Sequence, residues 1–117
     1  MYNLFLDDER MPKNVTWVKL PLVEWVIVRS YNQFVQVIKQ KGLPSLISFD
    51  HDLSYEDEKK TKDFKEKNGY DCAKFLFEYC MSKNLELPKY YIHSLNVVGR
   101  ENIFNLLNSF NKFQNID

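Results

Sequence analysis

The segment LISFDHD, residues 46–52, decides the fold that the sequence predicts. Its first four residues form a short, largely apolar run, as expected of a strand that is covered on both faces in a parallel sheet. Asp50, His51 and Asp52 follow directly. Ligands of open parallel sheets bind at the carboxyl ends of the strands. The segment therefore predicts an α/β protein with a binding or catalytic site at the end of this strand.

Three other segments, residues 2–6, 24–29 and 90–93, are rich in the residue types that are typical of strands. Polar residues again follow two of them, because the first runs into DDER (residues 7–10) and the last ends at His93. The carboxyl ends of parallel strands meet at one edge of a sheet. We therefore expect these polar residues to converge, although they are far apart in the sequence.

Three segments with apolar residues at helical spacing follow the strands. Ser30 is suited to the N-cap of the first, which ends at Gly42; the second begins at Gly69 and the third near Val98. Alternating strands and helices imply parallel pairing with right-handed crossovers. We expect one α/β domain over residues 1–117, a three-layer sandwich around a short, mostly parallel sheet of about four strands.

Two connections depart from this alternation. Residues 9–22 contain two prolines and have no helical period, so the first connection is expected to be irregular. Residues 54–68 carry ten charged residues among fifteen, which is typical of a solvated loop or a frayed helix. Because this segment starts directly after the polar cluster at residues 50–52, it could also close over a substrate as a lid.

The overall composition excludes several classes of protein. Sixteen basic and sixteen acidic residues cancel, so no global field would recruit duplex DNA. No stretch approaches the roughly 20 apolar residues of a membrane span, and two aspartates interrupt the first apolar run, so we expect a cytoplasmic protein with no membrane partner. Cys72 and Cys80 lie about 12 Å apart along a predicted helix, too far for a disulfide, and are expected to be reduced.

Four aspartates are candidate metal ligands. Asp7 and Asp8 follow the first strand, and Asp50 and Asp52 follow the third. If these strands are neighbours, the carboxylates face one space, where like charges are costly unless a proton or a cation joins them. Such oxygen ligands suit Mg²⁺ or Mn²⁺, with a phosphate completing the coordination. A single aspartate after a strand often only starts a turn, but the whole set favours a site.

His51 and His93 are the only histidines in the chain. A lone histidine at the end of a strand is more often structural than catalytic, but two at the predicted ligand edge favour a catalytic role. As a pair they could supply the base and the acid for phosphodiester cleavage, next to Asp50. Either ring could alternatively ligate a transition metal, with a neighbouring carboxylate orienting it.

Four residues are candidates for holding a phosphate group. Ser94 and Asn96 could hydrogen-bond phosphate oxygens or simply satisfy the backbone of their loop. Arg100 falls at the start of the last helix, where free N–H groups, the helix dipole and a guanidinium group form an anion site. Arg10, just beyond the aspartate pair, could supply a second clamp or be an ordinary surface residue.

Four motifs occur in order along the chain: LFLDDERMP (residues 4–12), SFDHDL (48–53), GYD (69–71) and HSLNVVGR (93–100). Together they resemble the signature of the cyclic-phosphate-processing receiver-like domain family, which derives from the receiver domain of two-component signalling. The resemblance spans almost the whole chain. It implies a receiver- or flavodoxin-like fold with an eroded first crossover, and an activity on cyclic phosphates.

The resemblance to ordinary receivers is partial. The pair at residues 7–8 matches the acidic pair of a receiver, Asp50 matches its phosphoacceptor and Ser94 its hydroxyl residue, but no fifth strand with the usual lysine is evident. His51 and His93 are foreign to a plain receiver. We therefore favour a metal-assisted phosphoesterase acting on a cyclic nucleotide or an RNA 2′,3′-cyclic end. The alternatives are a non-catalytic module that binds a phosphorylated ligand, and a switch phosphorylated at Asp50.

Overall fold

The computed structural model describes residues 1–53, 67–110 and 112. Its strands form one parallel sheet in the order β2-β1-β3-β4. This is the order of the first four strands of the flavodoxin-like fold. The predicted four-stranded α/β fold is thus confirmed, with every strand pair parallel. The elements are β1 (Asn3–Leu6), η1 (Pro12–Asn14), β2 (Val26–Val28), α1 (Tyr31–Lys41), β3 (Leu46–Phe49), α2 (Gly69–Lys83), β4 (Lys89–Ile92) and α3 (Val97–Asn108).

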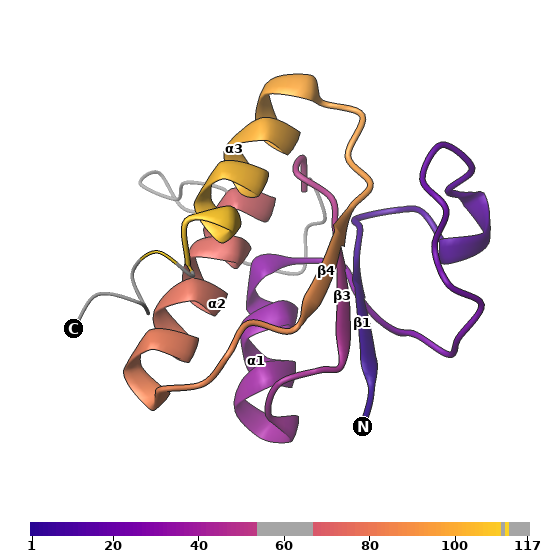
Figure 1. Ribbon diagram of the computed structural model, residues 1–117. Helices are drawn as coiled ribbons and strands as arrows, with labels where there is room; N and C mark the ends of the chain where they lie inside the picture. Colours follow the sequence, from indigo (N-terminus) through magenta and orange to yellow (C-terminus); the bar gives the residue numbers. More distant parts are fainter. Residues whose placement is uncertain (54–66, 111, 113–117) are drawn as a thin grey trace, which may run out of the picture.

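The three α-helices lie together on one face of the sheet, and the connection between β1 and β2 lies on the other (Figure 1). The strand order explains this, because the step from β1 to β2 runs in one direction and the steps to β3 and β4 run in the other. Right-handed crossovers then place the first connection opposite α1 and α2. The first connection contains only the 3-10 turn η1, so the layers are helices, sheet and an irregular segment.

The main core lies between the sheet and the helices. Alternate strand residues such as Leu4, Leu6, Ile47 and Phe49 are buried there. Each fully buried side chain of this size contributes about 1.5–3 kcal/mol to folding. This core holds the strand ends in register against the helices. The helices contribute Phe34, Ile38, Cys72, Ala73, Leu76, Cys80, Ile103 and Leu107 to it.

The helix boundaries follow local rules that the sequence predicted. Ser30 caps α1, since its hydroxyl accepts a hydrogen bond from the N–H of Gln33 (3.2 Å). Gly42 ends that helix with a φ of 83°, a conformation that favours glycine. Asparagines cap the other two helices, Asn68 at α2 and Asn96 at α3. Two helices therefore start directly beside the carboxyl edge of the sheet.

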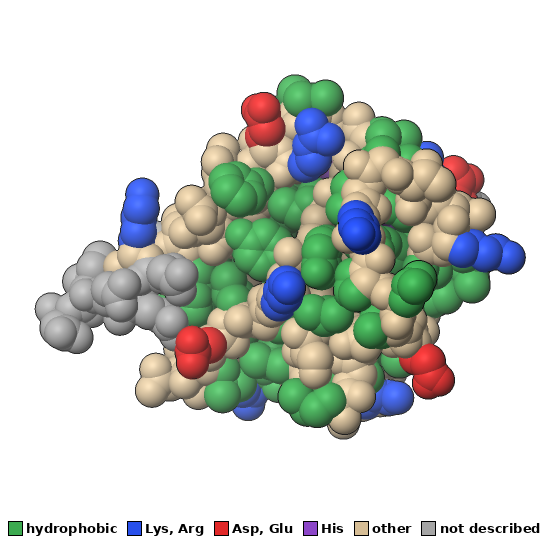
Figure 2. All heavy atoms as spheres, turned by 45° about the vertical axis from the view of Figure 1, so that its right-hand side comes forward, with side chains coloured by type: hydrophobic (Ala, Val, Ile, Leu, Met, Phe, Trp, Pro, Cys, Tyr) green, Lys and Arg blue, Asp and Glu red, His purple; other side chains and the backbone are tan. Residues whose placement is uncertain are grey.

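Side-chain hydrogen bonds tie the first connection to the ends of the strands. The indole Nε1 of Trp17 donates to the carbonyl oxygen of His93 (2.7 Å). The guanidinium group of Arg29 donates to the carbonyl oxygens of Asp7 (3.0 Å) and Arg10 (2.7 Å). Figure 2 looks partly onto this side, where hydrophobic side chains gather across the middle of the view with Lys and Arg side chains among them. The connection thus covers the sheet without a helix.

Three further expectations concern the remaining segments. Cys72 and Cys80 are buried in α2 and form no disulfide, as their spacing predicted. In the part of the chain that the structure describes, no helix is long and apolar enough to cross a membrane. The segment considered as a lid lies outside the described residues, apart from Lys67 and Asn68.

Candidate functional site

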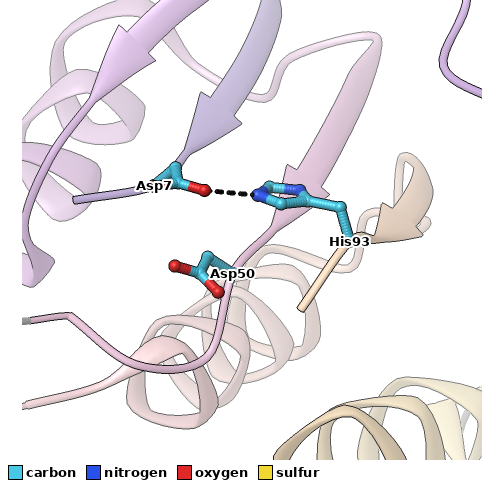
Figure 3. Close-up of side chains that lie close together, drawn as sticks. All are labelled: Asp7, Asp50 and His93. Carbon is cyan, nitrogen blue, oxygen red and sulfur yellow. Dashed lines mark hydrogen bonds and ion pairs between the residues drawn. The ribbon is translucent and has the colours of Figure 1, made fainter. Parts of the chain in front are cut away.

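Asp7, Asp50 and His93 form one row across the sheet, directly after the last residues of β1, β3 and β4 (Figure 3). Backbone hydrogen bonds extend the ladder to this row: Asp50 N donates to Leu6 O (3.0 Å) and His93 N to Phe49 O (2.9 Å). Successive strand residues point to opposite faces. The three side chains therefore share the face away from the helices, where one ligand atom from each lies within 4.8 Å of the others.

His93 is completely buried, and both of its ring nitrogens have partners. Its Nε2 donates to Oδ2 of Asp7 (3.0 Å), and its Nδ1 lies 2.6 Å from the hydroxyl oxygen of Ser48. A carboxylate only accepts, so in the neutral ring Nδ1 accepts the proton of Ser48. The ring also stacks on Phe5, with centroids 4.6 Å apart and planes 3° from parallel. These contacts fix the ring in one orientation.

Asp7 is a buried carboxylate that the surrounding donors keep ionised. Its Oδ1 accepts hydrogen bonds from the backbone N–H groups of Glu9 (2.9 Å) and Arg10 (2.8 Å). The guanidinium group of Arg10 lies 3.7 Å from Oδ2. Burial acts to raise the pKa of Asp7, but the hydrogen bonds from His93, Arg10 and Glu9 outweigh it and lower the pKa to about 2. A full negative charge therefore lies under the edge of the sheet.

Asp50 is a buried carboxyl group whose pKa is raised, whereas that of Asp7 is lowered. It is 5% exposed, and its Oδ1 accepts one hydrogen bond, from the backbone N–H of His51 (2.8 Å). Burial and the negative charges of Asp7 and Asp8 raise its pKa to about 7, although that hydrogen bond and Arg10 act to lower it. Asp8 is only partly buried. The negative charges of the three aspartates thus repel one another, and a bound proton or cation would reduce this repulsion.

His51 lies in a second cluster, on the helix side of the sheet edge. Its Nδ1 lies 2.9 Å from Oδ1 of Asp52, and the amide nitrogen of Asn96 lies 3.2 and 3.3 Å from the two Asp52 oxygens. The hydrogen bond from His51 lowers the pKa of Asp52, helped by that from Asn96, although burial opposes them. Nδ1 of His51 therefore holds a proton, and among the described residues its Nε2 has no hydrogen-bond partner.

Two glycines make room for this arrangement. A Cβ atom at Gly99, in the first turn of α3, would collide with the imidazole ring of His51. A Cβ atom at Gly69, the first residue of α2, would collide with the carbonyl oxygen of Asp50. The two helices can therefore approach the segment after β3 only where they lack side chains. The ring of His51 therefore packs directly against the backbone of α3 at Gly99.

The expected meeting of the two histidines does not occur in the described residues. The partners of His93 come from β1 and β3, whereas those of His51 are Asp52 and Asn96. Asp50 and His51 are neighbours in the chain, so their side chains leave on different faces. The sheet edge thus brings Asp7, Asp50 and His93 together and places His51 with Asp52.

The phosphate candidates lie in different places. Arg10 lies beside Asp7, with its guanidinium group 3.7 Å from the carboxylate. Ser94 is buried, and its hydroxyl accepts from the N–H of Asn96 (3.1 Å). Asn96 caps α3, accepting from the N–H of Gly99 (2.9 Å). Arg100 instead lines a cavity of about 430 Å³ with Tyr90, Ile92, Glu101 and Phe104.

Sequence reasoning missed the residues that hold His93 in place. Ser48 and Phe5 contact its ring, Trp17 binds its carbonyl oxygen, and Arg29 binds the backbone of Asp7. The period of two along a strand was a usable signal, because Phe5 and Ser48 stand two residues before Asp7 and Asp50. Trp17 carried no such signal, since an irregular connection has no period, and Arg29 directly follows β2, outside the row of site residues.

Comparisons with known proteins bear on this site. The model of the cyclic-phosphate processing Receiver domain matches residues 2–109, which include every candidate site residue. No curated protein and no solved structure matches the chain. The match covers most of the chain and both clusters. The chain therefore belongs to the cyclic-phosphate processing Receiver domain family.

Proposed function

We propose that the chain hydrolyses a cyclic phosphate diester at the row formed by Asp7, Asp50 and His93. The observation that carries this proposal is the convergence of these side chains within 4.8 Å, at the ligand-binding edge of a protein from a cyclic-phosphate processing family. A strained ring ester needs a nucleophilic water and a group that stabilises the charge of the attacked phosphate. The two clusters supply residues suited to each task.

Asp7, Asp8 and Asp50 are the residues that would hold a divalent cation. Their oxygens match the preference of Mg²⁺ and Mn²⁺, and burial together with the charges of Asp7 and Asp8 raises the pKa of Asp50 to about 7 although Arg10 acts to lower it. Such a cation would stabilise the charge of the phosphate oxygens. Both ring nitrogens of His93 are already hydrogen-bonded, one to Asp7 and one to Ser48, so His93 would not bind the cation itself. It would instead orient the carboxylate of Asp7 through their hydrogen bond.

His51 is the proposed proton-transfer residue. Asp52 holds the proton on Nδ1, which leaves Nε2 free to accept one, as in catalytic Asp–His pairs. In the proposed reaction, His51 takes a proton from the attacking water as its oxygen bonds to phosphorus. The ring phosphorus–oxygen bond breaks, and His51 returns the proton to the leaving oxygen. Asp52 is thus assigned to His51 rather than to the cation.

Arg10 is the proposed phosphate clamp. Its guanidinium group lies beside Asp7, and its side chain is 31% exposed, so it can reach a ligand at the edge of the row. A guanidinium group binds phosphate oxygens through two parallel hydrogen bonds. Ser94 is a second candidate donor, because its hydroxyl oxygen accepts from the N–H of Asn96 and, among the described residues, its proton has no acceptor. Arg100 is assigned no contact in this arrangement.

The direct test is a turnover screen. Purified protein would be incubated with 2′,3′-cyclic AMP, 3′,5′-cyclic AMP and RNA with a 2′,3′-cyclic end, in Mg²⁺, Mn²⁺ or EDTA, and products would be separated by chromatography. We expect ring opening that requires a divalent cation and is lost in Asp50→Asn. Glu24→Gln removes an exposed carboxylate outside the row and serves as the matched control.

Two other outcomes correspond to the alternative functions. Binding of a cyclic nucleotide without any product would favour a non-catalytic module. A covalent phosphoryl group at Asp50 after incubation with acetyl phosphate, detected by mass spectrometry, would favour a phosphoacceptor switch. Either outcome without ring opening would overturn the proposed hydrolysis.

A further inference from the structure

A cavity of about 570 Å³ adjoins His51, between the beginning of α2 and the middle of α3. This volume falls within the range of small-molecule sites. The described residues that line it are His51, Asn68, Tyr70, Asn102, Asn105 and Leu106. The cavity shares His51 with the proposed site, so a molecule bound at the sheet edge could extend into it.

The lining has the chemistry of a site for a planar, uncharged, polar group. Its described residues include three amides, a phenol and an imidazole, and none of them is Lys, Arg, Asp or Glu. A side-chain amide presents a donor and an acceptor together, which is how asparagine pairs with the edge of a nucleobase. An aromatic ring such as that of Tyr70 offers a stacking surface for a base.

Several of these polar groups are available to a ligand. Among the described residues, neither the amides of Asn102 and Asn105 nor the hydroxyl of Tyr70 makes a hydrogen bond. Asn68 uses its Oδ1 to accept from the N–H of Asp71 (3.1 Å), which leaves its amide nitrogen as a donor. A base that entered the cavity would therefore meet unused donors and acceptors.

The helix geometry places part of this lining on the same face of α3 that contacts His51. Gly99, Asn102 and Leu106 are three and four residues apart, so they share one face of α3. The ring of His51, the residue directly after Asp50, packs against that face at Gly99. A substrate whose phosphate lay at the edge of the sheet and that extended toward the helices would thus meet His51 before it reached Asn102.

We propose that this cavity binds the nucleobase of the substrate, so that the chain acts on a nucleoside cyclic phosphate and not on cyclic phosphates in general. This inference rests on the proposed function for the phosphate end. It assigns a substrate-binding role to Tyr70, Asn102 and Asn105, none of which carries the reaction itself.

The test compares 2′,3′-cyclic AMP with glycerol 1,2-cyclic phosphate, which has the same reactive ring and no base. The double variant Asn102→Ala/Asn105→Ala should raise the KM for the nucleotide about tenfold or more, because two hydrogen bonds to the base are lost. Turnover of the glycerol compound should stay unchanged. Both asparagines are exposed on α3, so the variant should fold, and Asn32→Ala on α1 is the matched control.

A binding measurement separates this inference from the proposed hydrolysis. Calorimetry with adenosine 3′-monophosphate and glycerol 2-phosphate needs no turnover. We expect the nucleotide to bind more tightly than the glycerol compound, and this preference to disappear in the double variant. Equal binding of the two compounds, or an unchanged preference in the variant, would overturn the base site even if cyclic phosphates are hydrolysed.

Discussion

Replacing Asp50 by Asn should make the protein more stable while it removes the proposed activity. Asp50 is buried next to the ionised Asp7, and burial and that charge raise its pKa to about 7. Above this pH the folded protein must hold a second buried negative charge. An amide has the shape of the carboxyl group without its charge, and it can still accept the hydrogen bond from the N–H of His51.

The size and the sign of the effect follow from the pKa. Against an ordinary value of 3.8, a pKa of about 7 makes ionised Asp50 destabilising by about 4 kcal/mol at pH 8, at about 1.4 kcal/mol per pKa unit. Between pH 4 and pH 7 the folded state holds a proton that the unfolded chain has lost, so stability falls as pH rises. The gain in Asp50→Asn should therefore be about 2 kcal/mol at pH 5 and vanish below about pH 4.

Urea unfolding in EDTA, followed by the fluorescence of Trp17 and Trp25, measures this directly. At pH 8 the midpoint of Asp50→Asn should lie about 2 M above that of the wild type, for a slope near 2 kcal/mol/M. The exposed control Glu24→Gln should change the midpoint little at either pH. A variant that is no more stable than the wild type at pH 8, or whose gain is equal at pH 5, would refute the argument.

Three further predictions concern the cation, His51 and the first helix. Mn²⁺ or Mg²⁺ should raise the melting temperature of the wild type but not that of Asp50→Asn, in a thermal-shift assay, because the cation binds only the folded aspartate cluster; an equal rise in both proteins would contradict the assigned ligands. Gly99→Ala should displace the ring of His51 and lower kcat for cyclic-phosphate hydrolysis about a hundredfold or more, the scale of general-base catalysis. If Gly99→Ala left both kcat and the NMR signal of His51 unchanged, His51 would not be a base that Gly99 positions. Ser30→Ala should cost about 1 kcal/mol in urea unfolding because α1 loses its cap; an unchanged midpoint would show that the cap contributes nothing.

The strands and helices could be predicted from the sequence because their signals are local. The cap at Ser30, the stop at Gly42 and the run before Asp50 each depend on a few adjacent residues. The strand order makes the ends of β1 and β3 neighbours, and this is why Asp7 and Asp50 meet as expected. The absence of an α-helix from the first connection, which holds only the 3-10 turn η1, also followed from local composition.

The placement of the histidines could not be predicted so directly, because it depends on register. We expected His51 and His93 to meet because their strand ends are adjacent. That expectation did not include the face of the sheet on which each side chain lies. Asp50 precedes His51 by one residue, so the alternation of a strand directs only one of them to the row with His93. Trp17, whose indole donates a hydrogen bond to the carbonyl oxygen of His93, comes from a segment without a periodic pattern.

We propose that Asp7, Asp8 and Asp50 support hydrolysis of a cyclic phosphate. Phosphorus NMR of 2′,3′-cyclic AMP measures this hydrolysis. The proteins compared are the wild type, Asp50→Asn and Glu24→Gln. Circular dichroism first verifies that each is folded, and each is then supplied with Mn²⁺ or Mg²⁺. We predict that the cyclic phosphate signal converts to a monoester signal with the wild type and Glu24→Gln, and persists with Asp50→Asn or EDTA. Undiminished conversion by Asp50→Asn, or no conversion of this compound by the wild type, would contradict the account.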